Sequence, residues 1–146
     1  MKKIMFDSNV FDKLPKIIEK IKNSAEKQYE YYITTVQVEE LCKIPDSKKE
    51  TRVANILMLA DLRPKLVPIS VFVLGRARLG YARLGEGLVY NKILKDNGSN
   101  KNDAIIADTC VNEGCILITE DKELHDRMIV NGYSVMYLDE FIKTIK

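Results

Sequence analysis

Histidine is almost absent from this chain: His125 is the only one among 146 residues. A histidine-rich zinc site is therefore excluded, and a Ser-His-Asp triad is disfavoured. Cysteine is also scarce. Cys42, Cys110 and Cys115 form no Cys-x-x-Cys pair, and an odd number leaves at least one of them unpaired. We expect all three to be small buried side chains.

Long apolar runs are absent as well. No stretch approaches the 18 residues of a membrane-spanning helix, and no signal peptide is evident, so we expect a cytoplasmic protein with no membrane partner. The charge is nearly balanced, with 23 Lys and Arg against 21 Asp and Glu, which argues neither for nor against a nucleic-acid partner. The length and the 46% hydrophobic content predict one globular domain over residues 1–146.

Strands and helices alternate along most of the chain. Predicted strands span residues 3–7, 31–34, 66–69, 115–119 and 134–137. Predicted helices span about 12–28, 34–44, 48–62, 74–88, 103–112, 121–131 and 139–146. Thr34 and Gln37 fit a capping box. In the helix over 48–62, the spacing predicts one buried face. Its members are Val53, Ile56, Leu57 and Ala60. This order predicts an α/β fold, a parallel sheet with helices on both faces.

Acidic residues stand at four predicted junctions between strands and helices. Asp7 follows the first strand, Glu39 and Glu40 follow the second, Asp103 opens the helix after the longest polar loop, and Asp121 follows the strand over 115–119. The carboxyl ends of parallel strands share one edge of a sheet, where ligands bind. Carboxylates gathered there repel one another unless a cation neutralises them. We therefore predict a site for Mg²⁺ or Mn²⁺ that activates water for phosphodiester chemistry.

Each acid also has a purely structural explanation. Asp7 fits a helix N-cap, and Asp103 and Asp121 stand at helix N-termini, where the helix dipole favours negative charge. Glu39 and Glu40 diverge by about 100° around a helix, so they cannot both face one site. The joint placement of the acids at one predicted edge favours the metal site over independent caps.

The acidic segments resemble the four motifs of the PIN-domain family of ribonucleases. The matching segments are Ile4–Val10, Thr35–Leu41, Asn102–Ala107 and Leu117–Leu124. In the second motif the acid immediately precedes a leucine, which selects Glu40 over Glu39. In the fourth, Glu123 stands where Asp is common and Leu124 where an aromatic residue is common. The resemblance runs from residue 3 to about 138, with all four motifs in the family's order.

This resemblance implies a PIN-like three-layer α/β/α sandwich with a mostly parallel sheet of about five strands. It also implies a metal-dependent endoribonuclease that leaves 5′-phosphate and 3′-hydroxyl ends. Asp7, Glu40, Asp103 and Asp121 would hold one or two Mg²⁺ or Mn²⁺ ions, with Asn9 and Thr119 as supporting polar groups. The length and compactness are similar to those of VapC-type toxins, which usually form homodimers and are blocked by a small antitoxin protein. Single-domain PIN nucleases also act outside such pairs.

An RNA substrate would need cations beside the acidic edge. Arg76 and Arg83 share one face of the helix predicted over 74–88. This face lies roughly a third of a turn away from the apolar stripe of the same helix, which is formed by Leu74, Ala77, Tyr81 and Leu84. The two arginines are candidate phosphate contacts, although an ordinary solvated face is the more common explanation of such a pair.

Two other α/β classes are excluded by missing residues. A phospho-receiver domain needs an Asp closing the third strand and a Lys closing the last, and neither is present. A haloacid-dehalogenase-type phosphatase needs Asp-x-Asp after the first strand, but Asn9 occupies the second of those positions. The remaining alternative is a non-catalytic PIN-like module that binds RNA or protein. The presence of all four acids favours the enzyme.

Overall fold

The central element of the fold is a five-stranded parallel sheet. The computed structural model describes residues 1–25, 29–70, 87–95, 98 and 100–145. Its strands are β1 (Lys2–Phe6), β2 (Tyr29–Ile33), β3 (Lys65–Leu66), β4 (Ile116–Ile118) and β5 (Val135–Met136). Their order across the sheet is β3-β2-β1-β4-β5, and each neighbouring pair is parallel. β1 is central, so its carboxyl end lies in the middle of the edge where a ligand site was expected.

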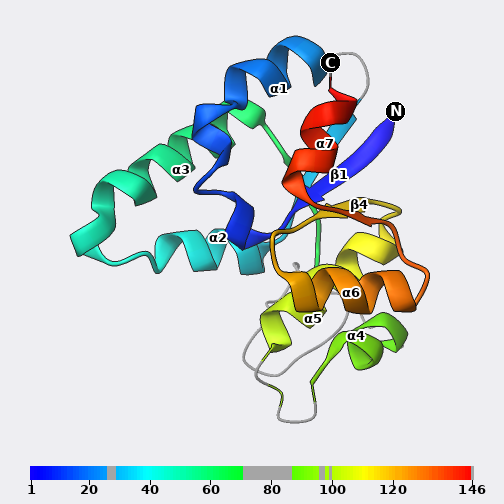
Figure 1. Ribbon diagram of the computed structural model, residues 1–146. Helices are drawn as coiled ribbons and strands as arrows, with labels where there is room; N and C mark the ends of the chain where they lie inside the picture. Colours follow the sequence, from blue (N-terminus) through cyan, green and yellow to red (C-terminus); the bar gives the residue numbers. More distant parts are fainter. Residues whose placement is uncertain (26–28, 71–86, 96–97, 99, 146) are drawn as a thin grey trace.

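Helices cover both faces of the sheet (Figure 1). They are α1 (Ile18–Ala25), α2 (Thr35–Cys42), α3 (Lys49–Leu62), α4 (Leu88–Ile93), α5 (Lys101–Asn112), α6 (Lys122–Val130) and α7 (Leu138–Thr144). Helices α1, α3 and α7 share one hydrophobic cluster with the sheet, and α4, α5 and α6 share the other. The predicted three-layer α/β/α sandwich of the PIN type is confirmed.

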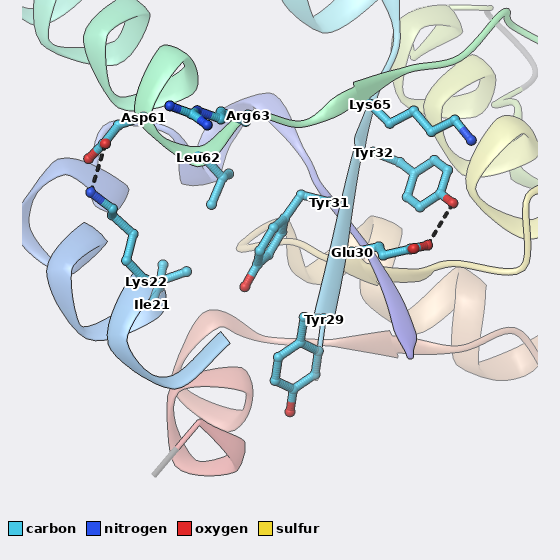
Figure 2. Close-up of a pocket in the computed structure, with 10 residues that line it drawn as sticks. All are labelled: Ile21, Lys22, Tyr29, Glu30, Tyr31, Tyr32, Asp61, Leu62, Arg63 and Lys65. Atoms are coloured by element: carbon cyan, nitrogen blue, oxygen red, sulfur yellow. Dashed lines mark hydrogen bonds and ion pairs between the residues drawn. The ribbon is translucent and has the colours of Figure 1, made fainter. Parts of the chain in front are cut away.

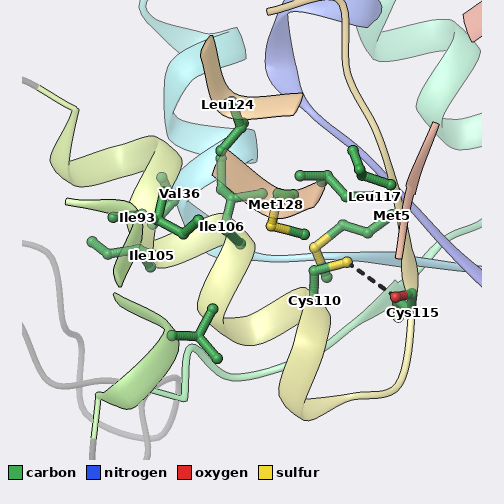
Figure 3. Close-up of a cluster of buried hydrophobic side chains, with 14 of the residues drawn as sticks. Met5, Val36, Ile93, Ile105, Ile106, Cys110, Cys115, Leu117, Leu124 and Met128 are labelled. Carbon is green, nitrogen blue, oxygen red and sulfur yellow. Dashed lines mark hydrogen bonds between the residues drawn. The ribbon is translucent and has the colours of Figure 1, made fainter. Parts of the chain in front are cut away.

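The two hydrophobic clusters follow from the alternation of side chains along the strands. On β1, Ile4 and Phe6 face the layer of α1, α3 and α7, whereas Met5 faces the opposite layer. The buried helix α5 packs against Met5 and Leu117 (Figure 3). Because α5 is buried along most of its length, it forms a rigid support for Asp103 in its first turn.

One edge of the sheet is only partly covered by a strand. β3 pairs with Tyr32 and Ile33 of β2, and its register extends no further along β2. Nearer the start of β2, its outer edge borders a pocket of about 530 Å³ between the middle of α1 and the end of α3 (Figure 2).

The first predicted helix begins later than expected. The segment after Asp12 forms a 3-10 turn over Leu14–Lys16, and α1 starts only at Ile18. Pro15 lies in this turn, and since proline lacks a backbone N–H it does not continue an α-helical ladder from residue 12.

The expected buried face of the helix over 48–62 is wrong, although the helix itself is present as α3. Val53, Ile56 and Leu57 are 51%, 46% and 64% exposed. The face that packs inward carries Asn55 and Met58 instead. The Asn55 Nδ2 donates to Asp12 Oδ1 at 2.8 Å, whereas its buried Oδ1 has no hydrogen-bond partner among the described residues. The apolar stripe on α3 therefore lies on the surface.

Two of the three cysteines are buried as expected. Cys110 and Cys115 lie in the hydrophobic cluster that α4, α5 and α6 share with the sheet. The Cys110 thiol donates to the Cys115 carbonyl oxygen at 3.5 Å. Cys42, at the end of α2, is exposed, so the expectation for this residue is wrong. All three are free thiols.

Candidate active site

Asp7 lies at the carboxyl end of β1 and is 2% exposed. Its backbone N–H donates to the Ile118 carbonyl oxygen at 2.9 Å, which continues the pairing of β1 with β4. Its carboxylate accepts two hydrogen bonds, one from the Ser8 N–H at 2.8 Å and one from Thr119 Oγ1 at 2.8 Å. The carboxylate is therefore fixed in a buried position by the ends of two adjacent strands.

Thr119 connects the polar groups around Asp7. Besides donating to Asp7, its hydroxyl oxygen accepts from Asn9 Nδ2 at 3.4 Å and from the Asp121 N–H at 3.1 Å. Asn9 Oδ1 in turn accepts from the Glu120 N–H at 3.2 Å. The structure thus places Asn9 and Thr119 beside Asp7, in one network that also positions the backbone of Asp121.

Gln37 is a site residue whose role beyond the capping box the sequence did not reveal. The side chain is fully buried. Its Oε1 accepts from the Thr34 N–H at 2.6 Å, as the capping box predicts, while its Nε2 donates to the Phe6 carbonyl oxygen at 2.6 Å. Gln37 therefore attaches the first turn of α2 to the end of β1, immediately before Asp7. Glu40 follows one turn later on the same helix.

The four acids interact electrostatically although they come from four separate segments. Burial, then the charge of Asp103, and to a smaller extent that of Glu40, raise the pKa of Asp7 from 3.8 to about 7. Burial, then the charges of Asp121 and Glu40, raise the pKa of Asp103 to about 6. Of the adjacent glutamates, Glu40 is the one whose charge acts on both groups. The carboxylates repel one another at this edge.

Helix capping explains two of the acids only in part and does not explain a third. Asp121 caps α6, since its Oδ1 accepts from the Glu123 and Leu124 N–H groups at 2.9 and 3.3 Å. Asp7 caps the short turn after β1 through Ser8, but its second oxygen is used by Thr119. Asp103 is not at the helix start as expected, because α5 begins at Lys101. Within the described chain its carboxylate accepts no capping hydrogen bond.

A family model described as a PIN domain matches residues 3–128. The chain belongs to the PIN-domain family. Members of this family are generally nucleases that use divalent metal ions. A comparison with curated proteins gave no match.

Solved structures with the same fold come from distant sequences. One is a domain of a functionally unknown protein from Methanocaldococcus jannaschii, with TM-score 0.61, 20% identity, and coverage of 94% of this chain and 91% of that one. Another is VapBC-1 from nontypeable Haemophilus influenzae, with TM-score 0.57, 19% identity, and coverage of 92% and 97%. At these identities the likeness shows the fold. Among the helices that the structure describes, none is long and apolar enough to cross a membrane.

Lys95 is a second residue of this PIN domain's site that the sequence did not indicate. Its ammonium group pairs with Glu123 and lowers the pKa of Asp103, opposing the effect of the other acids. Its backbone N–H donates to Asn100 Oδ1 at 2.7 Å, which fixes the chain on the approach to α5. Lys95 and Glu123 are 28 positions apart in sequence, so no local pattern marks the pair.

The donor set fits a hydrated divalent cation better than a closed metal cage. In the described part of the chain, no three acidic, histidine or cysteine side chains are placed together as a ready coordination shell. Mg²⁺ commonly binds through one or two carboxylates and keeps several waters, so it needs no such cage. A buried carboxylate whose pKa is raised by its acidic neighbours is stabilised by a cation. The residues therefore fit Mg²⁺ or Mn²⁺ in chemistry and charge.

Arg76 and Arg83, the candidate phosphate contacts, lie outside the described residues.

Proposed function

We propose that this chain is a Mg²⁺- or Mn²⁺-dependent endoribonuclease, with residues 1–146 acting as a single nuclease domain in the cytoplasm. The observation that supports this most strongly is the Asp7 carboxylate. It is almost completely buried, its pKa is raised to about 7, and the charges that act on it come from Asp103 and Glu40. The repulsion between these carboxylates is unfavourable in the metal-free protein, and a bound cation would relieve it. Nuclease activity is the general activity of the PIN-domain family.

The proposed roles follow from what each side chain already contacts. Asp7 and Asp103 would hold the cation most directly, with Glu40 binding directly or through water. Asp121 is better suited to an outer position, because its Oδ1 is occupied by the N-terminus of α6. Thr119 keeps Asp7 oriented by donating to its Oδ2, with Asn9 contacting the same hydroxyl. When bound, the divalent cation would supply water activation and stabilisation of charge on the scissile phosphate.

Lys95 and the candidate Arg76 and Arg83 would contribute positive charge toward the RNA backbone. Of these three cations, the structure describes only Lys95. It lies close enough to Asp103 to lower the pKa of that carboxyl, and its ion pair with Glu123 holds it there. A cation in this position offsets the repulsion between an acidic edge and a phosphodiester.

We further propose that the chain acts as the toxin of a toxin–antitoxin pair, as a homodimer that a small antitoxin blocks. The specific observation is the exposed apolar stripe of Val53, Ile56 and Leu57 on α3. An exposed apolar stripe of this kind suits a protein partner better than water. The fold of VapBC-1 supports the same class of partner.

The test is cleavage of single-stranded and structured RNAs by the purified protein in Mg²⁺, Mn²⁺ or EDTA. Asp7→Asn and Asp103→Asn remove one carboxylate each, and Asp46→Asn makes the same change where the carboxylate is 91% exposed. We expect cleavage that needs metal, disappears in the first two variants and survives in the third. Equal activity of all four proteins, or inactivity of the wild type, would refute the proposed nuclease. RNA binding without cleavage would indicate the non-catalytic module instead.

A further inference from the structure

A pocket lies at the outer edge of β2 (Figure 2). It lies between the middle of α1 and the end of α3, beside the part of β2 that β3 does not pair. Its described lining includes none of the four acids. A volume of about 530 Å³ lies within the range of about 300–1,000 Å³ of small-molecule sites. The pocket is therefore large enough for an organic ligand.

The charged groups around the pocket leave a surplus of positive charge. Lys22 pairs with Asp61 at 2.8 Å, and Glu30 accepts a hydrogen bond from a neighbouring tyrosine hydroxyl at 3.0 Å. Arg63 and Lys65 also line the pocket, and within the described chain neither forms an ion pair. Lys65 and Glu30 lie on the side of β2 that carries Tyr32, with Lys65 Nζ 5.7 Å from the centroid of the Tyr32 ring. On the side where Tyr31 projects, the two cations Lys22 and Arg63 stand against one carboxylate, Asp61, so an anionic ligand is favoured over a neutral or cationic one.

Arg63 adopts a backbone conformation that is unusual for its residue type. It ends α3 with φ 53° and ψ 54°, in the left-handed region where glycine is the usual residue. Among the described residues it is the only non-glycine residue with positive φ. Its backbone N–H donates to the Leu59 carbonyl oxygen at 3.0 Å, a contact that glycine would make equally well. The helix end therefore does not require the guanidinium group, and backbone strain of this kind at a pocket points to a functional side chain.

Tyr31 presents a hydroxyl group with no hydrogen-bond partner among the described residues, although the oxygen is buried. The ring is held in place by stacking on Phe6, with centroids 5.6 Å apart and planes 12° apart. Figure 2 shows the ring projecting from β2 into the pocket, with Ile21 and Leu62 as the apolar walls. A buried polar group without a partner is uncommon and calls for a ligand or water.

We infer that this pocket binds a nucleoside monophosphate. The guanidinium of Arg63, on the same side of β2 as Tyr31, provides the charge and donors that recognise a phosphate. The Tyr31 ring and the apolar walls provide a surface for a flat base, and the Tyr31 hydroxyl provides one hydrogen bond to it. Inorganic phosphate would leave most of the volume and the apolar side unfilled. The walls formed by α1 and α3 limit the ligand to a small molecule rather than a long RNA strand.

The test is isothermal titration calorimetry of the full chain with AMP, adenosine, inorganic phosphate and a 5′-phosphorylated oligonucleotide. EDTA is present throughout, so that no divalent cation can bridge a phosphate to the acidic edge. We expect AMP to bind with a 1:1 stoichiometry and more tightly than the other three. Arg63→Gly should weaken AMP binding about tenfold or more, since it removes a charged hydrogen-bond donor. Tyr31→Phe should weaken it several-fold.

Arg63→Gly is the most informative variant because it relieves the left-handed strain while it deletes the guanidinium group. It should keep or raise the melting temperature and still lose affinity. Lys48→Gln removes one exposed lysine outside the pocket, and Asp7→Asn removes a carboxylate of the acidic edge; both should bind AMP like the wild type. No binding of AMP to the wild type, undiminished binding by Arg63→Gly, or equal affinity for inorganic phosphate would overturn the inference. Binding of the oligonucleotide without binding of AMP would also overturn it.

Discussion

Replacing Asp7 by asparagine should stabilise the metal-free protein at neutral pH, although the residue is buried and doubly hydrogen-bonded. Raising the pKa of this carboxyl from 3.8 to about 7 corresponds to a penalty of about 4 kcal/mol for the ionised form in the folded state. Asparagine removes that charge at nearly constant volume. It also replaces one acceptor oxygen with an amide, so either the Ser8 N–H or Thr119 Oγ1 loses its partner, at about 1 kcal/mol. The net expectation is a gain of about 3 kcal/mol.

The sign of the pH dependence follows from the same carboxyl. Unfolded Asp7 ionises near 3.8 and folded Asp7 near 7, so the folded state holds the proton over this interval. The stability of the metal-free wild type should therefore fall as the pH rises from about 4 to 7. Asp103, whose pKa is about 6, acts in the same direction. Asp7→Asn should show a flatter dependence.

Urea unfolding in EDTA at several pH values between 5 and 8 measures both effects. Asp46→Asn is the matched control, because its carboxylate is 91% exposed and its removal should change the unfolding free energy little. Two results would contradict the claim that burial and neighbouring carboxylates raise the pKa of Asp7. One is an Asp7→Asn variant that is less stable than the wild type at pH 7.5, and the other is a wild type whose stability does not fall with rising pH.

Three further perturbations test separate contacts. Lys95→Met removes the cation that lowers the pKa of Asp103, so the acidic limb of a pH–activity profile should move to higher pH; an unmoved limb would contradict the assigned interaction. Thr119→Val deletes the donor to Asp7 and should cost about 1–2 kcal/mol in urea unfolding, whereas a neutral result would show that the hydrogen bond contributes little. Asp108→Ala leaves the buried Ser70 hydroxyl and the Tyr90 N–H without their acceptor, and unfolding experiments should show a loss of about 2–4 kcal/mol.

Local chemistry in the sequence was enough to predict the parts of the fold that depend on neighbouring residues. The capping box of Thr34 and Gln37 places the start of α2 correctly, because the hydrogen bond from the Thr34 N–H to Gln37 Oε1 is made within four residues. The strand β1 and the acid that follows it are likewise readable from a short apolar run ending in Asp7.

The features that the sequence could not supply depend on distant partners. Periodicity identifies the apolar stripe of Val53, Ile56 and Leu57, but it cannot show which face of α3 the core covers. Asn55 is buried because Asp12, 43 positions away, accepts its hydrogen bond. The Asp108 carboxylate accepts from Ser70, 38 positions away. Such contacts exist only after the sheet has brought the segments together.

The most direct measurement is the titration of the protein with Mn²⁺, followed by calorimetry or by electron paramagnetic resonance. The wild type should bind Mn²⁺ saturably, Asp7→Asn and Asp103→Asn should each lose most of that affinity, and Asp46→Asn should retain it. Excess Mg²⁺ should compete for the same site. Failure of the wild type to bind Mn²⁺, or equal binding by all four proteins, would contradict the assignment of the acidic edge as a divalent-metal site.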